Sequence, residues 1–319
     1  MGYIKIISCS ILVFLGAQAM KCERYKDPSV PDAVIGVAKD TLQFALENSS
    51  KWEKVHAAEY ILNLQYANNV FDVFVEEEKR NRHEPYYRIG LWRVLSRAAK
   101  TNEEKNKWLD SISRVFGKQG ALDRIHAAEA LAKLEVSPKT ISVKVTDSIL
   151  GDVHNPMWAY TYWGTAYTSA KDMCQVKNNF VDLVLNSNES ILIKRIALYA
   201  LYKMKNVGVQ NWDLLTSRVL DEPRNSPLYT SYLICTLANS PKDSLFSPRF
   251  FECRRMMEEQ IQSLQEDQLA AALGVYEEIA TAEDIPFLTS FLDKGADQHN
   301  VETIMAAANA LLNIDREGR

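Results

Sequence analysis

The tetrapeptide His-Ala-Ala-Glu occurs twice, from His56 to Glu59 and from His126 to Glu129. Residues three apart share one face of an α-helix, so each histidine would lie beside its glutamate. Imidazole and carboxylate groups bind metals, and two such pairs could in principle hold one ion between helices. Helical layers of about 10 Å each would, however, separate the two copies by about 20 Å. We therefore expect no metal and no cofactor, and we interpret both pairs as local pairs that could contribute to a ligand-binding face.

A second group of candidate residues is aromatic. The flat faces of Trp and Tyr pack on sugar rings or on peptide side chains, and both residues are enriched at binding hot spots. Trp92, Trp163 and Tyr162 share the apolar face of their segments and are expected in the core. The expected ligand-binding residues outside that face, with their polar neighbours, are Tyr86, Tyr87, Arg88, His154, Asn155, Trp158 and Tyr160. A thick aromatic core between larger helices would explain the same residues equally well.

No known catalytic motif accompanies these residues. The sequence lacks the G-x-S-x-G nucleophile elbow, the H-E-x-x-H metalloprotease motif and a glycine-rich phosphate-binding loop. Acidic runs such as residues 76–78 are typical of solvated helix faces. The sequence therefore favours binding over catalysis, and it predicts no catalytic residue.

The segments that carry the candidate residues recur with a period of 35 residues. Six copies of the pattern lie at 54–64, 88–95, 124–134, 159–166, 194–204 and 304–314. In each copy, small or apolar residues follow the first residue at three, four, seven and ten positions, which is typical of one face of an α-helix. A fixed period of this length indicates a repeat architecture.

Other amphipathic segments lie between these copies, and turn residues separate the resulting pairs. We expect these helices near 32–48, 69–79, 102–116, 139–150, 171–185, 209–220, 247–262 and 282–293. The sequence thus predicts eight helical hairpins, of which the sixth and seventh, near 226–238 and 266–279, match the pattern least well. Because no change in composition separates two domains, we expect one repeat domain over 32–314, after a polar lead-in at 20–31 and before a charged tail at 315–319.

This pattern resembles the HEAT repeat family, in which the second helix of each hairpin has the form R-x-x-A-A-x-A-L-x-x-L. The residues that match this form position by position are Arg124, Ala127, Ala128, Ala130, Leu131 and Leu134. The resemblance implies an all-α, right-handed α-solenoid whose second helices line a concave surface. The Asp that usually precedes the second helix is often missing, and Trp92 and Trp163 replace small residues. Such a motif specifies architecture and says almost nothing about activity.

The first 19 residues resemble a secretory signal peptide. Lys5 precedes an apolar run that extends to Gly16, and residues 17–19 form an A-x-A cleavage site. Lys21 departs from the lipoprotein pattern before Cys22, so we expect cleavage after Ala19 and a soluble mature chain in the periplasm or outside the cell. In an oxidising compartment Cys235 and Cys253 have two alternatives, a disulfide or two buried free thiols.

Composition and charge narrow the range of partners. The chain has 319 residues, of which 47% are apolar, and a formal net charge of -4. The absence of a long basic run disfavours nucleic acid and anionic membrane surfaces, and no later segment has the length and hydropathy of a transmembrane helix.

The main functional hypothesis is a non-enzymatic exported scaffold that binds a protein or peptide along its concave surface. The alternatives are carbohydrate recognition by the aromatic residues, or a carbohydrate-active enzyme shaped as a helical toroid. A stack that closes on itself around paired carboxylates would favour that enzyme.

Overall fold

The computed structural model describes residues 29–66, 69–186, 188–241, 247–294 and 299–318. Within these ranges all regular structure is helical and no β-strand occurs, so the expected all-α class is confirmed. The expected signal peptide and cleavage site, Cys22 and most of the expected polar lead-in lie outside the described residues. None of the described helices is both long and apolar enough to cross a membrane.

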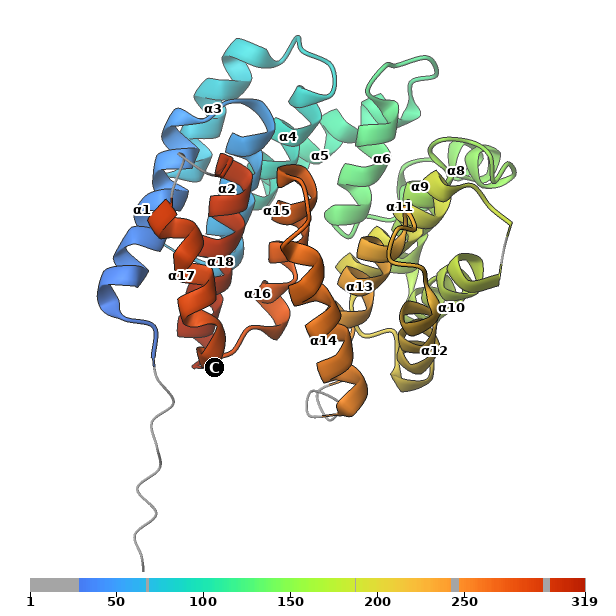
Figure 1. Ribbon diagram of the computed structural model, residues 1–319. Coiled ribbons are helices and arrows are strands. Elements are labelled where there is room, and N and C mark those ends of the chain that lie inside the picture. Colours follow the sequence, from blue (N-terminus) through green and yellow to red (C-terminus); the bar gives the residue numbers. More distant parts are fainter. Residues whose placement is uncertain (1–28, 67–68, 187, 242–246, 295–298, 319) are drawn as a thin grey trace, which may run out of the picture.

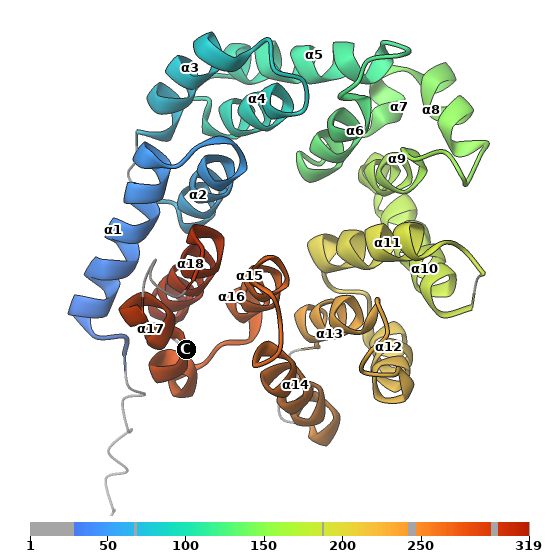
Figure 2. The same cartoon turned by 45° about the horizontal axis from the view of Figure 1, so that its top comes forward.

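The helices form two layers that follow a ring (Figure 1, Figure 2). The inner layer contains α2 (Lys51–Leu64), α4 (Tyr87–Ala98), α6 (Arg124–Lys133), α9 (Trp158–Thr165), α11 (Ile191–Met204), α13 (Tyr229–Ala238), α15 (Glu266–Gly274), α16 (Tyr276–Ile279) and α18 (Val301–Glu317). The outer layer contains α1 (Asp32–Asn48), α3 (Val70–Asn81), α5 (Asn102–Gly117), α7 (Pro138–Ile141), α8 (Val143–Leu150), α10 (Ala170–Asn186), α12 (Val209–Asp221), α14 (Pro248–Ile261) and α17 (Ile285–Lys294). Each outer helix packs against the inner helix that follows it in the chain, α7 and α8 both against α9.

Every segment that was expected to be helical contains a helix, but two of these segments are interrupted. Ser142 has an extended backbone and separates α7 from α8, where its hydroxyl accepts a hydrogen bond of 3.3 Å from the Val145 amide. Val275 separates α15 from α16. Hydrophobic periodicity locates long amphipathic helices, but it does not register a break of one residue that keeps the same face buried.

The two ends of the helical array meet. Helix α18 packs against α1 and α2 as well as against α15 and α17 (Figure 2). All residues of α18 from Thr303 to Ile314 are buried, which is typical of a helix that has neighbours on every side. Leu312 and Met305 belong to the same apolar cluster as Leu42 and Leu46 of α1. The sequence predicted a curved stack with a concave surface and kept a stack that closes on itself only as an alternative.

Polar contacts join the same two ends. The His56 Nδ1 atom of α2 lies 2.8 Å from the Glu302 Oε1 atom of α18. Near the end of α18, the Arg316 guanidinium donates a hydrogen bond of 2.8 Å to the backbone carbonyl oxygen of Asn63. These contacts join residues about 250 positions apart, at separations of 246 and 253. The inner layer is therefore a closed ring, since each inner helix contacts the next and α18 contacts α2.

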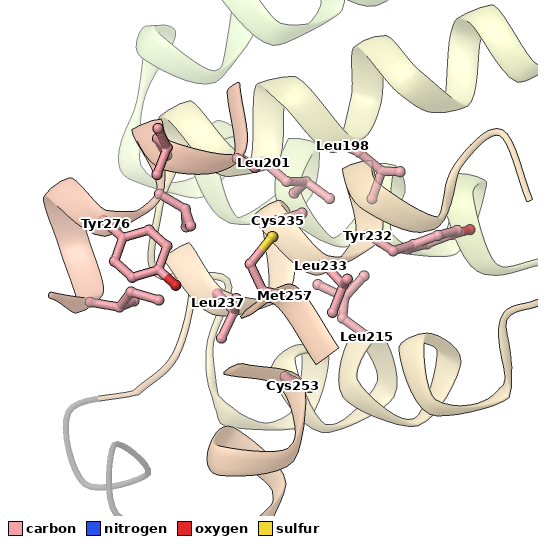
Figure 3. Close-up of a cluster of buried hydrophobic side chains, with 14 of the residues drawn as sticks. Leu198, Leu201, Leu215, Tyr232, Leu233, Cys235, Leu237, Cys253, Met257 and Tyr276 are labelled. Carbon is pink, nitrogen blue, oxygen red and sulfur yellow. The ribbon is translucent and has the colours of Figure 1, made fainter. Parts of the chain in front are cut away.

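The largest apolar cluster fills the space between the two layers over the second half of the chain. Figure 3 shows part of it, where Leu198 and Leu201 of α11 face Cys235 of α13 and Met257 of α14. Cys235 and Cys253 are both buried in this cluster and both are free thiols. Burial raises the pKa of Cys235 to about 12 and that of Cys253 to about 11. The sequence left a disulfide and two buried free thiols as alternatives, and the structure shows the free thiols. These thiols stay protonated at neutral pH.

Gly164 marks the closest approach between α9 and α7. A Cβ atom added at this position would lie 2.8 Å from the Pro138 Cδ atom and 3.3 Å from its Cγ atom. Overpacking of this kind costs about 1–3 kcal/mol, against a gain of up to about 1 kcal/mol from the helix propensity of Ala. We expect Gly164→Ala to lower the free energy of unfolding by about 1 kcal/mol, measured by urea denaturation. Gly117→Ala, where the added Cβ meets nothing within 4 Å, is the control, and equal stability of the two variants would contradict the prediction.

Candidate functional site

A cavity of about 1340 Å³ lies inside the ring. Almost all of its lining comes from the inner helices, from α2 round to α18, and it combines charges of both signs with aromatic rings. The basic side chains are Arg93, Arg97, Lys105, Lys133, Arg195 and Lys203, and the acidic ones are Glu59, Glu129, Glu135, Glu277 and Glu302. The aromatic side chains are Tyr60, Tyr160, Trp163, Tyr167, Tyr199 and Tyr202.

The helical period explains how one inner helix serves both the core and the cavity. On α2, His56, Glu59 and Asn63 are spaced by three and four residues and line the cavity. Ala57 and Ala58 of the same helix are fully buried against the neighbouring helices. Because the sequence repeats, Glu129 occupies the position on α6 that Glu59 occupies on α2, and both carboxylates reach the same cavity.

Four of these charges form a network across three helices. The Arg93 side chain of α4 is almost completely buried, with 2% of its surface exposed. Its Nε atom donates a hydrogen bond of 2.6 Å to Glu59 of α2, while its Nη2 atom is buried without a hydrogen-bond partner among the described residues. On α6, the Lys133 Nζ atom lies 2.9 Å from a carboxylate oxygen of Glu129. Two cations and two carboxylates therefore neutralise one another at the wall of the cavity.

The charges of this network are fixed around neutral pH. Burial alone would raise the pKa of Glu59, but the positive charges of Arg93 and Lys133 outweigh it and hold the pKa at about 2. Burial would also raise the pKa of Glu129, but the positive charges of Lys133 and Arg93 outweigh burial and lower that pKa. Burial would lower the pKa values of Arg93 and Lys133, but their anionic and tyrosine neighbours raise both. All four groups are therefore ionised over a wide range of pH.

Tyrosine and lysine side chains of helix α11 also line the cavity. The Lys203 Nζ atom lies 4.4 Å from the centre of the Tyr202 ring and 5.8 Å from that of Tyr199. The Lys133 Nζ atom approaches the Tyr199 ring from α6, at 5.3 Å. Cations over aromatic faces are stabilised by the ring quadrupole. Burial raises the pKa of Tyr202, so its phenol is neutral near pH 7.

Of the candidate residues predicted from the sequence, four line this cavity: His56, Glu59, Glu129 and Tyr160. The rings of His56 and His126 both lie within 6.5 Å of the Trp52 ring, at 6.5 Å and 5.9 Å. The large Trp52 side chain therefore lies between the two histidines of the His-Ala-Ala-Glu copies, whose helical layers were expected to be about 20 Å apart.

Two of the predicted residues make structural contacts instead. Tyr87 was expected to be partly exposed, but it is buried, and its hydroxyl donates a hydrogen bond of 2.9 Å to Glu77. The Arg88 guanidinium donates two hydrogen bonds, of 2.6 Å and 3.1 Å, to the fully buried carboxylate of Asp123. This pair joins the start of α4 to the start of α6 and so fixes the spacing of adjacent repeats.

The aromatic residues near α9 are divided between different environments. Trp158 is half-buried and stacks on Tyr162, with ring centres 5.0 Å apart. His154 is exposed in the preceding turn, and the Asn155 side chain accepts a hydrogen bond from the Met157 amide, so it stabilises that turn. Of residues 154–160, Tyr160 alone lines the cavity. Residues 154–160 therefore do not form one continuous patch.

Comparison of the chain with protein families and with curated proteins gives no match from which a function could be transferred. No protein-family model matches it. No curated protein matches it either. Within the described part of the chain, no group of three or more His, Cys, Asp or Glu side chains is placed to hold a metal ion. The chemistry of the cavity is thus the basis for a functional proposal.

Sequence reasoning missed several residues that line the cavity. Arg93 lies inside the apolar run of residues 89–95. A charge within such a run indicates a paired, buried side chain, because buried Arg is rare unless it is paired. Arg93 could therefore have been identified from the sequence. Lys133, Tyr199 and Lys203 carried no comparable signal. Their positions within the repeat are typical of a solvated helix face, and only the closure of the ring turns that face toward a cavity.

Proposed function

We propose that this chain is an exported, non-enzymatic protein that binds a carbohydrate in the cavity inside its ring. The observation that carries the proposal is the lining, in which fixed charges of opposite sign neutralise one another beside several aromatic rings. Export rests on the resemblance of residues 1–19 to a signal peptide.

The proposed architecture is a right-handed HEAT-like solenoid of eight hairpins that closes on itself. The period of 35 residues and the match to the HEAT pattern at residues 124–134 support it. The order of packing, in which each outer helix contacts the next inner helix, is the order that stacked hairpins require.

Binding is favoured over catalysis by the protonation states of the lining. A glycosidase needs a carboxylic acid whose pKa is raised so that it can protonate the leaving group. The cavity has paired carboxylates, but the pKa of Glu59 is about 2 and that of Glu129 is also lowered, so neither holds a proton near neutral pH. The closed ring and the paired carboxylates match a toroidal enzyme, but the lowered pKa values leave neither Glu59 nor Glu129 as the proton donor that such an enzyme needs.

A carbohydrate matches this lining better than the peptide partner favoured by the sequence. Closure of the ring replaces an open groove, along which a protein could lie, by a cavity. The network around Arg93 offers hydrogen-bond donors and acceptors without a net charge, which matches neutral hydroxyl groups. The volume exceeds the roughly 300–1,000 Å³ of ordinary small-molecule pockets, so an oligosaccharide is a better match than a single sugar.

Affinity for an immobilised glycan panel tests this proposal. We expect the mature chain to bind at least one oligosaccharide, and Tyr199→Ala to weaken that binding by about fivefold, because one lost aromatic contact is worth about 1 kcal/mol. The matched control is Phe251→Ala, which removes an exposed ring on the outer helix α14 and leaves the cavity unchanged. Equal affinity of the Tyr199 variant and the wild type would show that the cavity is not the binding site.

The same panel separates the other two hypotheses. Release of new reducing ends or unsaturated products from a bound polysaccharide would establish an enzyme. Absence of glycan binding, together with saturable binding of a peptide library that Tyr199→Ala abolishes, would support the peptide hypothesis instead.

A further inference from the structure

Tyr86 has a backbone conformation that is unfavourable for any residue other than glycine. Its φ is 67° and its ψ is -60°, and the Tyr87 amide donates a hydrogen bond of 2.8 Å to the Pro85 carbonyl oxygen. These values define the rarer and strained form of the three-residue γ-turn. Conformations of this kind persist only where surrounding contacts enforce them, and they cluster at binding and active sites.

Core packing does not account for this strain, because 43% of the Tyr86 surface is exposed. The turn instead directs the ring toward His126, which itself lies beside Trp52. The centre of the Tyr86 ring lies 5.1 Å from that of His126, edge to face at 73°. The His126 ring in turn lies 5.9 Å from the Trp52 ring at 34°. We call Trp52, Tyr86 and His126 the rim cluster.

Gly90 holds Trp52 in its place within the rim cluster. A Cβ atom at residue 90 would lie only 2.9 Å from the Trp52 Cζ3 atom, so the indole rests directly on the backbone of α4. The cluster is therefore assembled from α2, the turn before α4, and α6, and each ring is positioned by a different element. Burial lowers the pKa of His126, so its imidazole is neutral near pH 7 and the cluster carries no net charge.

The rim cluster is continuous with the cavity. His56 lines the cavity, and its ring lies 6.5 Å from that of Trp52. On the other side, the His126 Nδ1 atom is 3.9 Å from Glu129, which also lines the cavity. A ligand that fills the cavity can therefore extend to these three rings.

We infer that the rim cluster is a subsite that packs against one sugar ring at the end of the carbohydrate bound in the cavity. This inference rests on the proposed function. The apolar face of a pyranose matches uncharged aromatic rings, and the strained turn at Tyr86 is the means by which the exposed ring is held ready for contact.

Replacement of Tyr86 by glycine separates a binding role from a structural one. Glycine adopts positive φ without strain, so Tyr86→Gly is expected to move the urea midpoint of unfolding to a higher concentration. The same variant loses the ring, so its affinity for the oligosaccharide selected on the glycan panel is expected to fall about fivefold to tenfold. Tyr86→Phe retains the ring, so it keeps the aromatic contact with the ligand. Its affinity is therefore expected to stay within about twofold of the wild type.

Each outcome has a distinct meaning. A Tyr86→Gly protein that is more stable and binds as tightly as the wild type would overturn the rim subsite and leave the cavity proposal standing, since Tyr199→Ala tests the cavity independently. A Tyr86→Gly protein that is less stable would show that the ring is structural, which also overturns the inference. If the wild type binds no glycan, the rim subsite and the proposed function both fail.

Discussion

Glu59→Gln is expected to lower the free energy of unfolding by about 3 kcal/mol at pH 7, because removal of the partner of a buried charge leaves that charge uncompensated. Here the remaining charge would be Arg93, which has 2% of its surface exposed and donates its hydrogen bond to Glu59. Glutamine can still accept that bond, so the loss belongs at the lower end of the range for such pairs. Urea denaturation at pH 7 measures the effect, with Asp40→Asn at an exposed position of α1 as the control.

The same pair gives stability a defined dependence on pH. The folded pKa of Glu59, about 2, lies below the ordinary value of 4.5. A lowered folded pKa contributes stability that is complete above the unfolded pKa and is lost as the pH falls toward the folded one. The difference in stability between wild type and Glu59→Gln should therefore be constant above about pH 5 and shrink steadily as the pH falls toward 2. A difference that stayed constant over that interval would contradict the charge pairing of Glu59.

Leu312→Ala is expected to destabilise the protein by about 2–5 kcal/mol, the range for a leucine truncated in a packed core. Leu312 of α18 is fully buried in the cluster that also contains residues of α1, α2, α3 and α4. The cavity left by the mutation would lie at the contact that closes the ring. Hydrogen exchange should therefore accelerate first in α1 and α18.

The control for this experiment is Ile191→Ala, which removes similar apolar bulk from a residue that is 50% exposed. It should change stability by less than about 1 kcal/mol. Similar losses in the two variants, or acceleration of exchange spread evenly over all helices, would mean that the contact between α18 and α1 does not hold the ring closed.

The helices could be predicted from the sequence because their signal is local. Small and apolar residues at helical spacing located α6 and α11 within a few residues, and the expected 32–48 segment is α1 with the same bounds. Closure of the ring could not be predicted, because it results from small rotations between adjacent repeats that accumulate around the array. No single residue encodes such a rotation.

The candidate site was only partly predictable for the same reason. Glu59 and Glu129 could be identified because a repeated tetrapeptide contains them, and both line the cavity. Lys203 could not, since an exposed-looking lysine becomes a cavity residue only when helices from the other side of the ring face it. Tyr86 follows a proline, which indicates a turn, but the sequence does not show which type of turn it is or that the Tyr86 ring meets His126.

The contact between α18 and α1 also changes how the protein should unfold. A linear repeat array has two terminal units with one neighbour each, and these fray before the middle does. In a closed array every unit has two neighbours, so unfolding has no terminal unit at which to begin. Opening any one interface must then relax the curvature of all the others, which couples the first and last repeats despite the length of chain between them. Closure thus gives a repeat protein the all-or-none cooperativity of a small globular domain.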